Sequence, residues 1–96
     1  MTRVEVTLPA RQDIYDIWDY IARDHVDAAD RVVEEIRRQF FKLAEFPGLG
    51  HTHRELAPVY RVWRVYTYLI VYLPDKEPLQ IVRVVSAYRD LKHVVE

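Results

Sequence analysis

The stretch from residue 79 to residue 90 constrains the fold more than any other part of the sequence. It begins as a β-branched apolar run, which favours a strand buried on at least one face. Arg83 interrupts this run, and a charge inside an apolar strand requires a partner or a solvated face. Ser86, Tyr88 and Arg89 follow where the strand leaves the sheet. We therefore predict that this strand is the centre of a small sheet and that its cationic side carries the function.

Length and composition indicate one domain, residues 1–96. A chain that is 50% hydrophobic and 30% charged has the balance of a soluble globular protein with a single core. The absence of cysteine excludes disulfides and thiolate metal sites. The start of the chain lacks the apolar block of a signal peptide, and no apolar run approaches the roughly 20 residues of a membrane helix. We therefore expect a cytoplasmic protein without a membrane partner.

The charge is unevenly distributed, although the net charge is only −1. Residues 1–49 carry 7 lysines and arginines against 10 acidic residues, whereas residues 50–96 carry 7 against 5. Since the overall field is not that of a general nucleic-acid binder, direct nucleic-acid binding is expected to be weak or absent. The predicted sheet nevertheless belongs to the basic half of the chain.

Two amphipathic helices are predicted before the sheet, after a short alternating strand over residues 4–8. The first helix runs over about residues 9–23, with Pro9 in its first turn. The second begins at an N-cap, Asp27, and ends before Pro47. Their apolar stripes consist of Ile14, Ile17, Trp18, Ile21 and Ala22 in the first helix, and of Ala29, Val32, Ile36, Phe40 and Leu43 in the second. A short connection makes them an antiparallel hairpin.

Three strands are predicted after the hairpin, over residues 60–65, 68–73 and 79–86. Tyr66 and Thr67 form a tight turn between the first two, without the usual glycine or asparagine. Strict alternation in the last strand places Ile81, Arg83 and Val85 on one face. Both faces of the sheet are largely apolar, yet one layer of helices can cover only one of them. The second face is therefore predicted to stay exposed as a partner site.

Several short motifs share this order of elements with a known family. They are residues 16–22, 43–50, 55–56, 60–62, 68–72, 81–85 and 89–90. Together they resemble the ParE/RelE superfamily of toxins from type II toxin–antitoxin systems, and the ParE branch more than the RelE branch. The sequence departs from many relatives at Ser86, where they have a histidine.

The resemblance implies an α+β fold, with an N-terminal strand and an antiparallel helical hairpin packed on one face of an antiparallel sheet. It also implies a cognate ParD-like antitoxin that wraps the toxin and silences it. ParE-like toxins are associated with inhibition of DNA gyrase, whereas RelE-like toxins cut messenger RNA on the ribosome. A third possibility is a relative that binds its antitoxin but no longer poisons a target.

The candidate partner-binding residues lie on or beside the predicted strands: Arg61, Trp63, Arg64, Arg83 and Arg89. If Arg61 and Arg83 lie on adjacent strands, they can converge on one face and attract phosphate or an acidic antitoxin. The alternative is ordinary ion pairing with nearby acids, namely Glu55, Asp75, Glu77 or Asp90. On the first interpretation, Arg83→Ala weakens antitoxin binding or toxicity and leaves the fold intact.

A metal-independent ribonuclease would need a base, an acid and cations around the phosphate. Its candidate residues here are Arg61, Arg83, Tyr88, Arg89 and His93. The set is sparse, because Lys92 is the one lysine near it and Ser86 stands where a histidine would serve. His51, His53 and Glu55 lack a fixed further ligand, so we expect no metal and no cofactor. Catalysis is therefore the alternative to a binding function.

Overall fold

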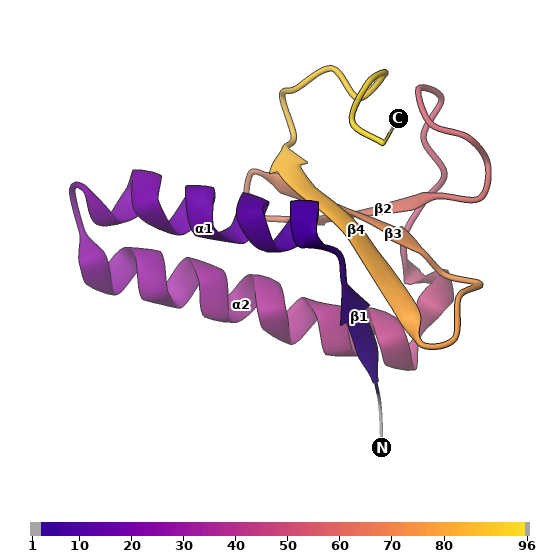
Figure 1. Cartoon of the computed structure of the whole chain (residues 1–96), viewed down its shortest axis with the longest axis horizontal. Helices are drawn as coiled ribbons and strands as arrows, with labels where there is room; N and C mark the ends of the chain where they lie inside the picture. Colours follow the sequence, from indigo (N-terminus) through magenta and orange to yellow (C-terminus); the bar gives the residue numbers. More distant parts are fainter. Residues whose placement is uncertain (1–2, 96) are drawn as a thin grey trace.

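The computed structural model describes residues 3–95, which form a helical hairpin on a mixed sheet (Figure 1). Its elements are, in order, β1 (Val4–Val6), α1 (Leu8–Ala22), α2 (Val26–Glu45), the 3-10 helix η1 (Pro47–Leu49), β2 (Arg61–Val65), β3 (Tyr68–Leu73) and β4 (Leu79–Ser86). The strand order is β1-β4-β3-β2, so β4 lies inside the sheet as predicted. The predicted α+β fold is confirmed. Neither helix within residues 3–95 has the length and apolar character needed to cross a bilayer.

The N-terminal strand β1 adds to the edge of the sheet in parallel orientation. Val6 lies opposite Ile81 of β4, whereas β2, β3 and β4 pair in the predicted antiparallel meander. In the sequence both helices lie between β1 and the meander, which provides the long connection that two parallel strands such as β1 and β4 require. Val4 and Val6 pack against the main core while Glu5 is exposed, as their alternation predicts.

Both helices begin at a side chain that caps the first turn. The hydroxyl of Thr7 accepts from the backbone of α1 and donates to the Val82 carbonyl at 2.8 Å, which joins the start of α1 to β4. The cap of α2 is His25, whose Nδ1 accepts a first-turn N–H at 3.0 Å. The prediction of Asp27 as the cap is therefore wrong. Asp27 lies inside the first turn, where its charge favours the helix dipole.

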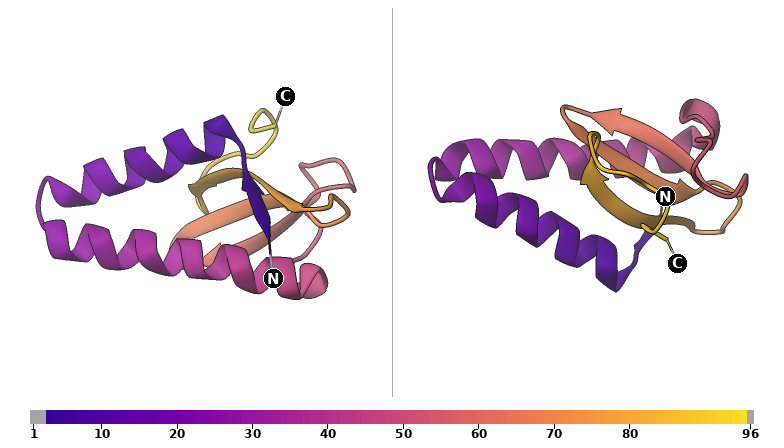
Figure 2. Two further views of the ribbon diagram at one scale, coloured as in Figure 1. Left: turned by 60° about the horizontal axis from the view of Figure 1, so that its bottom comes forward. Right: turned by 90° about the horizontal axis from the view of Figure 1, so that it is seen from above.

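The main core lies between the helical hairpin and one face of the sheet. The buried helical residues are Ala10, Ile14, Ile17, Ala29, Val33, Ile36, Phe40 and Leu43. Most of the predicted stripe residues are buried here. Trp18, Ile21 and Val32 pack against this core while partly exposed, Ala22 is half-buried outside it, and Val33 is buried although it was not predicted. In Figure 2 the connected ends of the two helices extend beyond the sheet, which leaves side chains there without a strand to pack on.

The second face of the sheet is covered by the chain itself, so the prediction of a bare apolar face is wrong. The cluster on that face consists of Leu56, Val62, Val71, Val85, Leu91 and Val94. Leu91 and Val94 belong to residues 91–95, called the C-terminal strap below, and are 1% and 4% exposed. Figure 1 shows this strap and the loop before β2 on the side of the sheet away from α2. An apolar face of this size is unfavourable in water, and the strap covers it together with the loop before β2.

A β-bulge interrupts β4. The pairing with β3 changes register between Val71 and Tyr72, which leaves Val82 as the extra residue. Because of this insertion, Ile81 faces the helices and Val85 faces the opposite cluster. Strict alternation had placed these two residues on the same face, and the bulge is the physical reason for the difference.

The connection between β2 and β3 is the predicted two-residue turn. Val65 pairs with Tyr68, so that Tyr66 and Thr67 form the tip. Tyr66 has φ +54°, a left-handed conformation that costs an L-residue about 1–2 kcal/mol. Its side chain is 57% exposed, so packing does not compensate for this strain.

Gly50 provides the space in which Tyr72 docks η1 onto the sheet. Tyr72 is fully buried, and its hydroxyl donates to the Pro47 carbonyl at 2.7 Å and accepts from the Gly50 N–H at 2.9 Å. Burial raises the pKa of Tyr72, so the hydroxyl stays protonated and can donate. A Cβ at position 50 would lie 2.5 Å from this hydroxyl and 2.7 Å from the Val62 carbonyl.

We therefore predict that Gly50→Ala lowers the free energy of unfolding by about 1–3 kcal/mol, as overpacking does in other cores. Gly48→Ala is the matched control, because no atom of the described residues would lie within 4 Å of a Cβ at position 48. The control should change the free energy by no more than about 0.5 kcal/mol. Urea denaturation followed by circular dichroism measures both, and equal values would contradict the packing role of Gly50.

Candidate partner-binding site

The structure distributes the predicted partner-binding residues of β2 over both faces of the sheet. Arg61 and Trp63 lie on the side of the helices. The Arg61 guanidinium donates to the Gly50 carbonyl at 2.8 Å, and the Trp63 indole donates to the Gln39 side chain at 2.9 Å. Arg64 is exposed on the other face, and its Nε donates to the Tyr66 carbonyl at 2.8 Å.

Arg61 and Arg83 do not converge, which corrects the arrangement expected from the sequence. Strand β3 separates β2 from β4, so the two residues are not on adjacent strands. Arg61 pairs with Tyr72 on the side of the main core, whereas Arg83 pairs with Val71 of the second cluster. Strand order, which the sequence does not specify, decides this point.

Arg83 forms a bidentate ion pair with Asp13 of α1. The distances are 2.7 Å from Nε to Oδ2 and 2.9 Å from Nη2 to Oδ1. Asp13 Oδ2 also accepts the Val84 N–H at 2.9 Å, and Arg83 Nη1 donates to the Val94 carbonyl of the strap at 2.9 Å. The hydrogen bond with Asp13 raises the pKa of Arg83. Arg83 therefore joins α1, β4 and the strap, and its partner is none of the four acids considered above.

The remaining candidates for ribonuclease chemistry lie after β4. Tyr88 is 80% exposed, and Arg89 lines a hollow together with Tyr20. His93 lies in the strap and lines a different hollow beside Arg83. The loop histidine His53 accepts the Glu55 N–H at 3.1 Å. Within residues 3–95, no group of three histidine or acidic side chains is placed to hold a metal ion.

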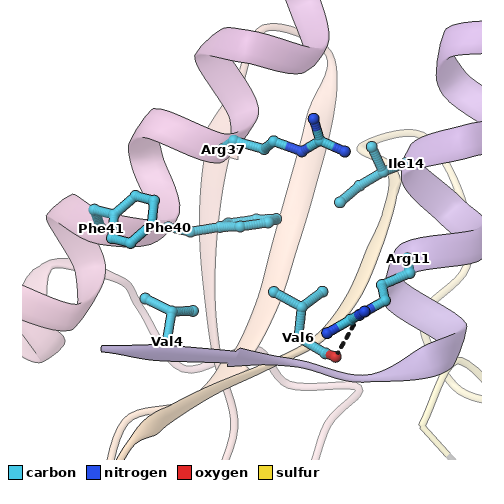
Figure 3. A pocket seen from close by; sticks show the side chains of 7 residues that line it. All are labelled: Val4, Val6, Arg11, Ile14, Arg37, Phe40 and Phe41. Atoms are coloured by element: carbon cyan, nitrogen blue, oxygen red, sulfur yellow. Dashed lines mark hydrogen bonds between the residues drawn. The ribbon is translucent and has the colours of Figure 1, made fainter. Parts of the chain in front are cut away.

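A groove that these predictions do not include lies where β1 meets the helical hairpin (Figure 3). Its first part, with a volume of ≈ 340 Å³, is lined by Val4, Val6, Arg11, Ile14, Arg37, Phe40 and Phe41. A second hollow of ≈ 580 Å³ shares Arg11, Ile14 and Arg37 and continues past Tyr15. Phe41 and Tyr15 are 55% and 59% exposed, so the groove is open and partly aromatic. Two guanidinium groups flank its apolar lining.

The outer edge of β1 borders this groove. Among the described strands β1 pairs with β4 alone. The Thr7 N–H donates to the Ile81 carbonyl at 3.0 Å, so the main-chain groups of Val6 point away from β4. Figure 3 shows Arg11 on this outer side, where its Nε donates to the Val6 carbonyl at 3.1 Å. A free edge of this kind is a template for an additional strand.

Comparison with known proteins agrees with this architecture. Residues 4–91 match the family model described as the ParE toxin of the type II toxin–antitoxin system parDE. The chain belongs to the ParE toxin family. This confirms the resemblance to the ParE branch, and the match extends from β1 to the first residue of the C-terminal strap.

A solved structure from a chromosomal ParDE toxin–antitoxin system of P. aeruginosa has the same fold as this ParE family member. The TM-score is 0.74, with 21% sequence identity over 90% of this chain and 96% of that chain. At this identity the likeness concerns the fold alone. No curated protein sequence matches the chain.

The sequence contains one signal for the groove of this ParE family member. Phe40 and Phe41 are consecutive, and consecutive side chains of a helix point about 100° apart. Only one of them can therefore face the core, and Phe40 is 3% exposed. Arg11 and Arg37 fall on the polar faces of their helices, where they are indistinguishable from solvating residues. Their convergence depends on how the hairpin meets β1.

Proposed function

We propose that this chain is the toxin of a type II toxin–antitoxin pair and that a ParD-like antitoxin silences it by binding in the groove. The observation that carries this proposal is the combination of a free strand edge with an apolar groove flanked by Arg11 and Arg37. An extended segment can pair with β1 through its main chain and place apolar side chains against Phe41. Carboxylates on the same segment can meet both guanidinium groups.

The charges in the groove are available to a partner. Arg37 forms no ion pair within residues 3–95. Arg11 uses its Nε for the exposed bond to Val6, which leaves its terminal nitrogens for a ligand. An acidic segment would therefore gain charge-assisted hydrogen bonds without first breaking an internal salt bridge. This supports an antitoxin with an acidic binding region.

We further propose that the toxin inhibits DNA gyrase by stoichiometric contact and so blocks replication in the cytoplasm. Membership of the ParE family supports this target, and the geometry supports binding over catalysis. Arg83 is committed to Asp13 and to the strap, and Arg61 lies on the opposite face of the sheet. A ribosome-dependent messenger RNA endoribonuclease of the RelE type would need these groups to converge on one phosphate.

Induction of the chain alone in bacteria tests the proposal. Filamentation with DNA damage is expected, together with inhibition of supercoiling by purified gyrase. Co-expression of the small protein encoded by the neighbouring reading frame should restore growth and yield a stable complex. Rapid arrest of translation with cleaved transcripts would instead assign the RelE-type activity. Normal growth would indicate that the chain is a relative that binds its antitoxin but has no toxic function.

A further inference from the structure

A second surface lies on the flank of α1 opposite the groove. It includes a hollow of ≈ 410 Å³ between α1, the tip of the β2–β3 turn and the end of β4, and Tyr20, Thr67 and Arg89 are among the residues that line it. We call the surface the tyrosine face and define it by Tyr20 and Arg89 of the hollow together with Tyr66, Tyr88 and Arg64. Tyr66 and Tyr88 are chain neighbours of Thr67 and Arg89, and Arg64 extends from the other face of the sheet to the Tyr66 carbonyl at the turn. The three tyrosines are 73%, 57% and 80% exposed, respectively. The Ala87 N–H donates to the Thr67 carbonyl at 2.7 Å, which holds the turn and the end of β4 together.

The strained tyrosine at the tip of the turn points to a function for this face. A two-residue turn with a positive φ favours glycine, asparagine or aspartate. Tyr66 occupies this position with φ +54° and a largely exposed side chain, so neither the turn nor the core requires it. Strained residues of this kind concentrate at functional sites. The side chain of Tyr66 is therefore best explained by a contact outside this chain.

The hollow within the tyrosine face has an apolar floor. Ile17, Val84 and Val85 line it and are 9%, 2% and 4% exposed. Tyr68 lies at its side, and burial together with the nearby Tyr20 raises the pKa of Tyr68, which keeps its hydroxyl neutral. An inserted apolar side chain would therefore lie against aliphatic and aromatic groups.

Resting on the proposed toxin function, we infer that the tyrosine face is the surface through which the toxin contacts its target protein. Tyrosine and arginine are enriched among the residues that dominate binding at protein interfaces. Arg64 and Arg89 form no ion pair within residues 3–95. The occupant is therefore a protein surface that places an apolar side chain in the hollow and carboxylates beside these two arginines.

The acidic side chains of the hollow favour a protein over a nucleic acid. Asp16 lines the hollow and accepts a hydrogen bond from Gln12 at 2.8 Å, and within residues 3–95 it forms no ion pair. A polynucleotide carries a charge at every phosphate and would bring one close to this carboxylate. A protein can instead place carboxylates only at Arg64 and Arg89.

Helix α1 separates the tyrosine face from the groove, so contact with the target and binding of the antitoxin are separable. Tyr66→Gly is the most informative variant, because it removes the side chain and also the strain. We expect its Tm to rise by about 4–8 °C. Its half-inhibitory concentration for gyrase supercoiling and the induction level needed for growth arrest should both rise by about tenfold or more. Antitoxin affinity should be unchanged. Tyr20→Ala and Arg89→Glu should show the same loss of inhibition.

Phe46→Ala is the control, because Phe46 is an equally exposed aromatic residue, 54%, at the end of α2. It should change neither inhibition nor antitoxin affinity.

The assignment is overturned if Tyr66→Gly and Tyr20→Ala retain full toxicity, or if they lose antitoxin binding to the same extent as they lose toxicity. It is also overturned if the face binds a labelled single-stranded RNA that Tyr66→Gly releases. If the wild-type toxin arrests growth but does not inhibit gyrase, the gyrase proposal alone is contradicted. The role of the tyrosine face is then still tested by the effect of its variants on growth arrest. A wild-type chain that arrests nothing contradicts both.

Discussion

Asp13→Ala is expected to lower the free energy of unfolding by about 3 kcal/mol, because it leaves a partly buried guanidinium without its counterion. The side chains of Arg83 and Asp13 are 20% and 12% exposed, so water screens the pair only in part. The same substitution also removes the acceptor of the Val84 N–H. The unpaired Arg83 would then lie between the apolar strand and the strap.

Urea denaturation measures this loss, and Asp16→Ala is the matched control one helical turn away. Asp16 is exposed, and among the described residues its side chain accepts only from Gln12, so its replacement should cost no more than about 0.5 kcal/mol. The double variant Asp13→Ala/Arg83→Met removes both charges and should recover part of the loss. Equal stability of Asp13→Ala and Asp16→Ala would show that the ion pair contributes nothing to the fold.

The same geometry revises what an Arg83 substitution means. The sequence suggested that Arg83→Ala would affect binding and leave the fold intact. Its contacts with Asp13 and Val94 predict instead a destabilised chain with a loosened strap. A loss of toxicity in Arg83→Ala would therefore not by itself place Arg83 in a binding site.

Patterns within one element could be predicted from the sequence, and relations between distant elements could not. Periodicity placed both helices and the three strands of the meander, because burial of one face imposes a regular spacing. The ion pair joins residues 70 positions apart, and no local spacing indicates it. The strap has no sequence signal, because a six-residue tail with three apolar positions has no clear period. The bare face was predicted because that tail was not counted as a cover.

The groove also depends on contacts between distant segments. Arg11 and Arg37 belong to different helices, and both join one rim only because α1 and α2 meet beside β1. The position of β1 follows in turn from its parallel pairing with β4, at the far end of the chain. The composition shows an excess of basic over acidic residues in residues 50–96 only. The two arginines that line the groove nevertheless belong to residues 1–49. The sequence thus predicted a cationic partner site, but its candidate residues did not include the two arginines that line the groove.

The double variant Arg11→Glu/Arg37→Glu is expected to weaken antitoxin binding by about 100-fold or more. Each substitution places a like charge opposite a carboxylate of the proposed acidic segment, which costs several kcal/mol at an interface. The fold should be retained, because Arg37 forms no ion pair within residues 3–95 and the bond of Arg11 to Val6 is exposed. Titration calorimetry with the purified antitoxin measures the dissociation constant, and circular dichroism checks the fold.

Arg31→Glu/Arg54→Glu is the control for a general effect of charge, because it changes the net charge equally at exposed positions outside the groove. It should reduce affinity by only a small factor that disappears as salt is raised, since exposed charges beyond a Debye length are screened. The groove variant should stay weak at high salt, because its charges would lie against the bound segment. If both double variants lose affinity equally at every salt concentration, the antitoxin does not occupy this groove, even though the chain is a ParE toxin.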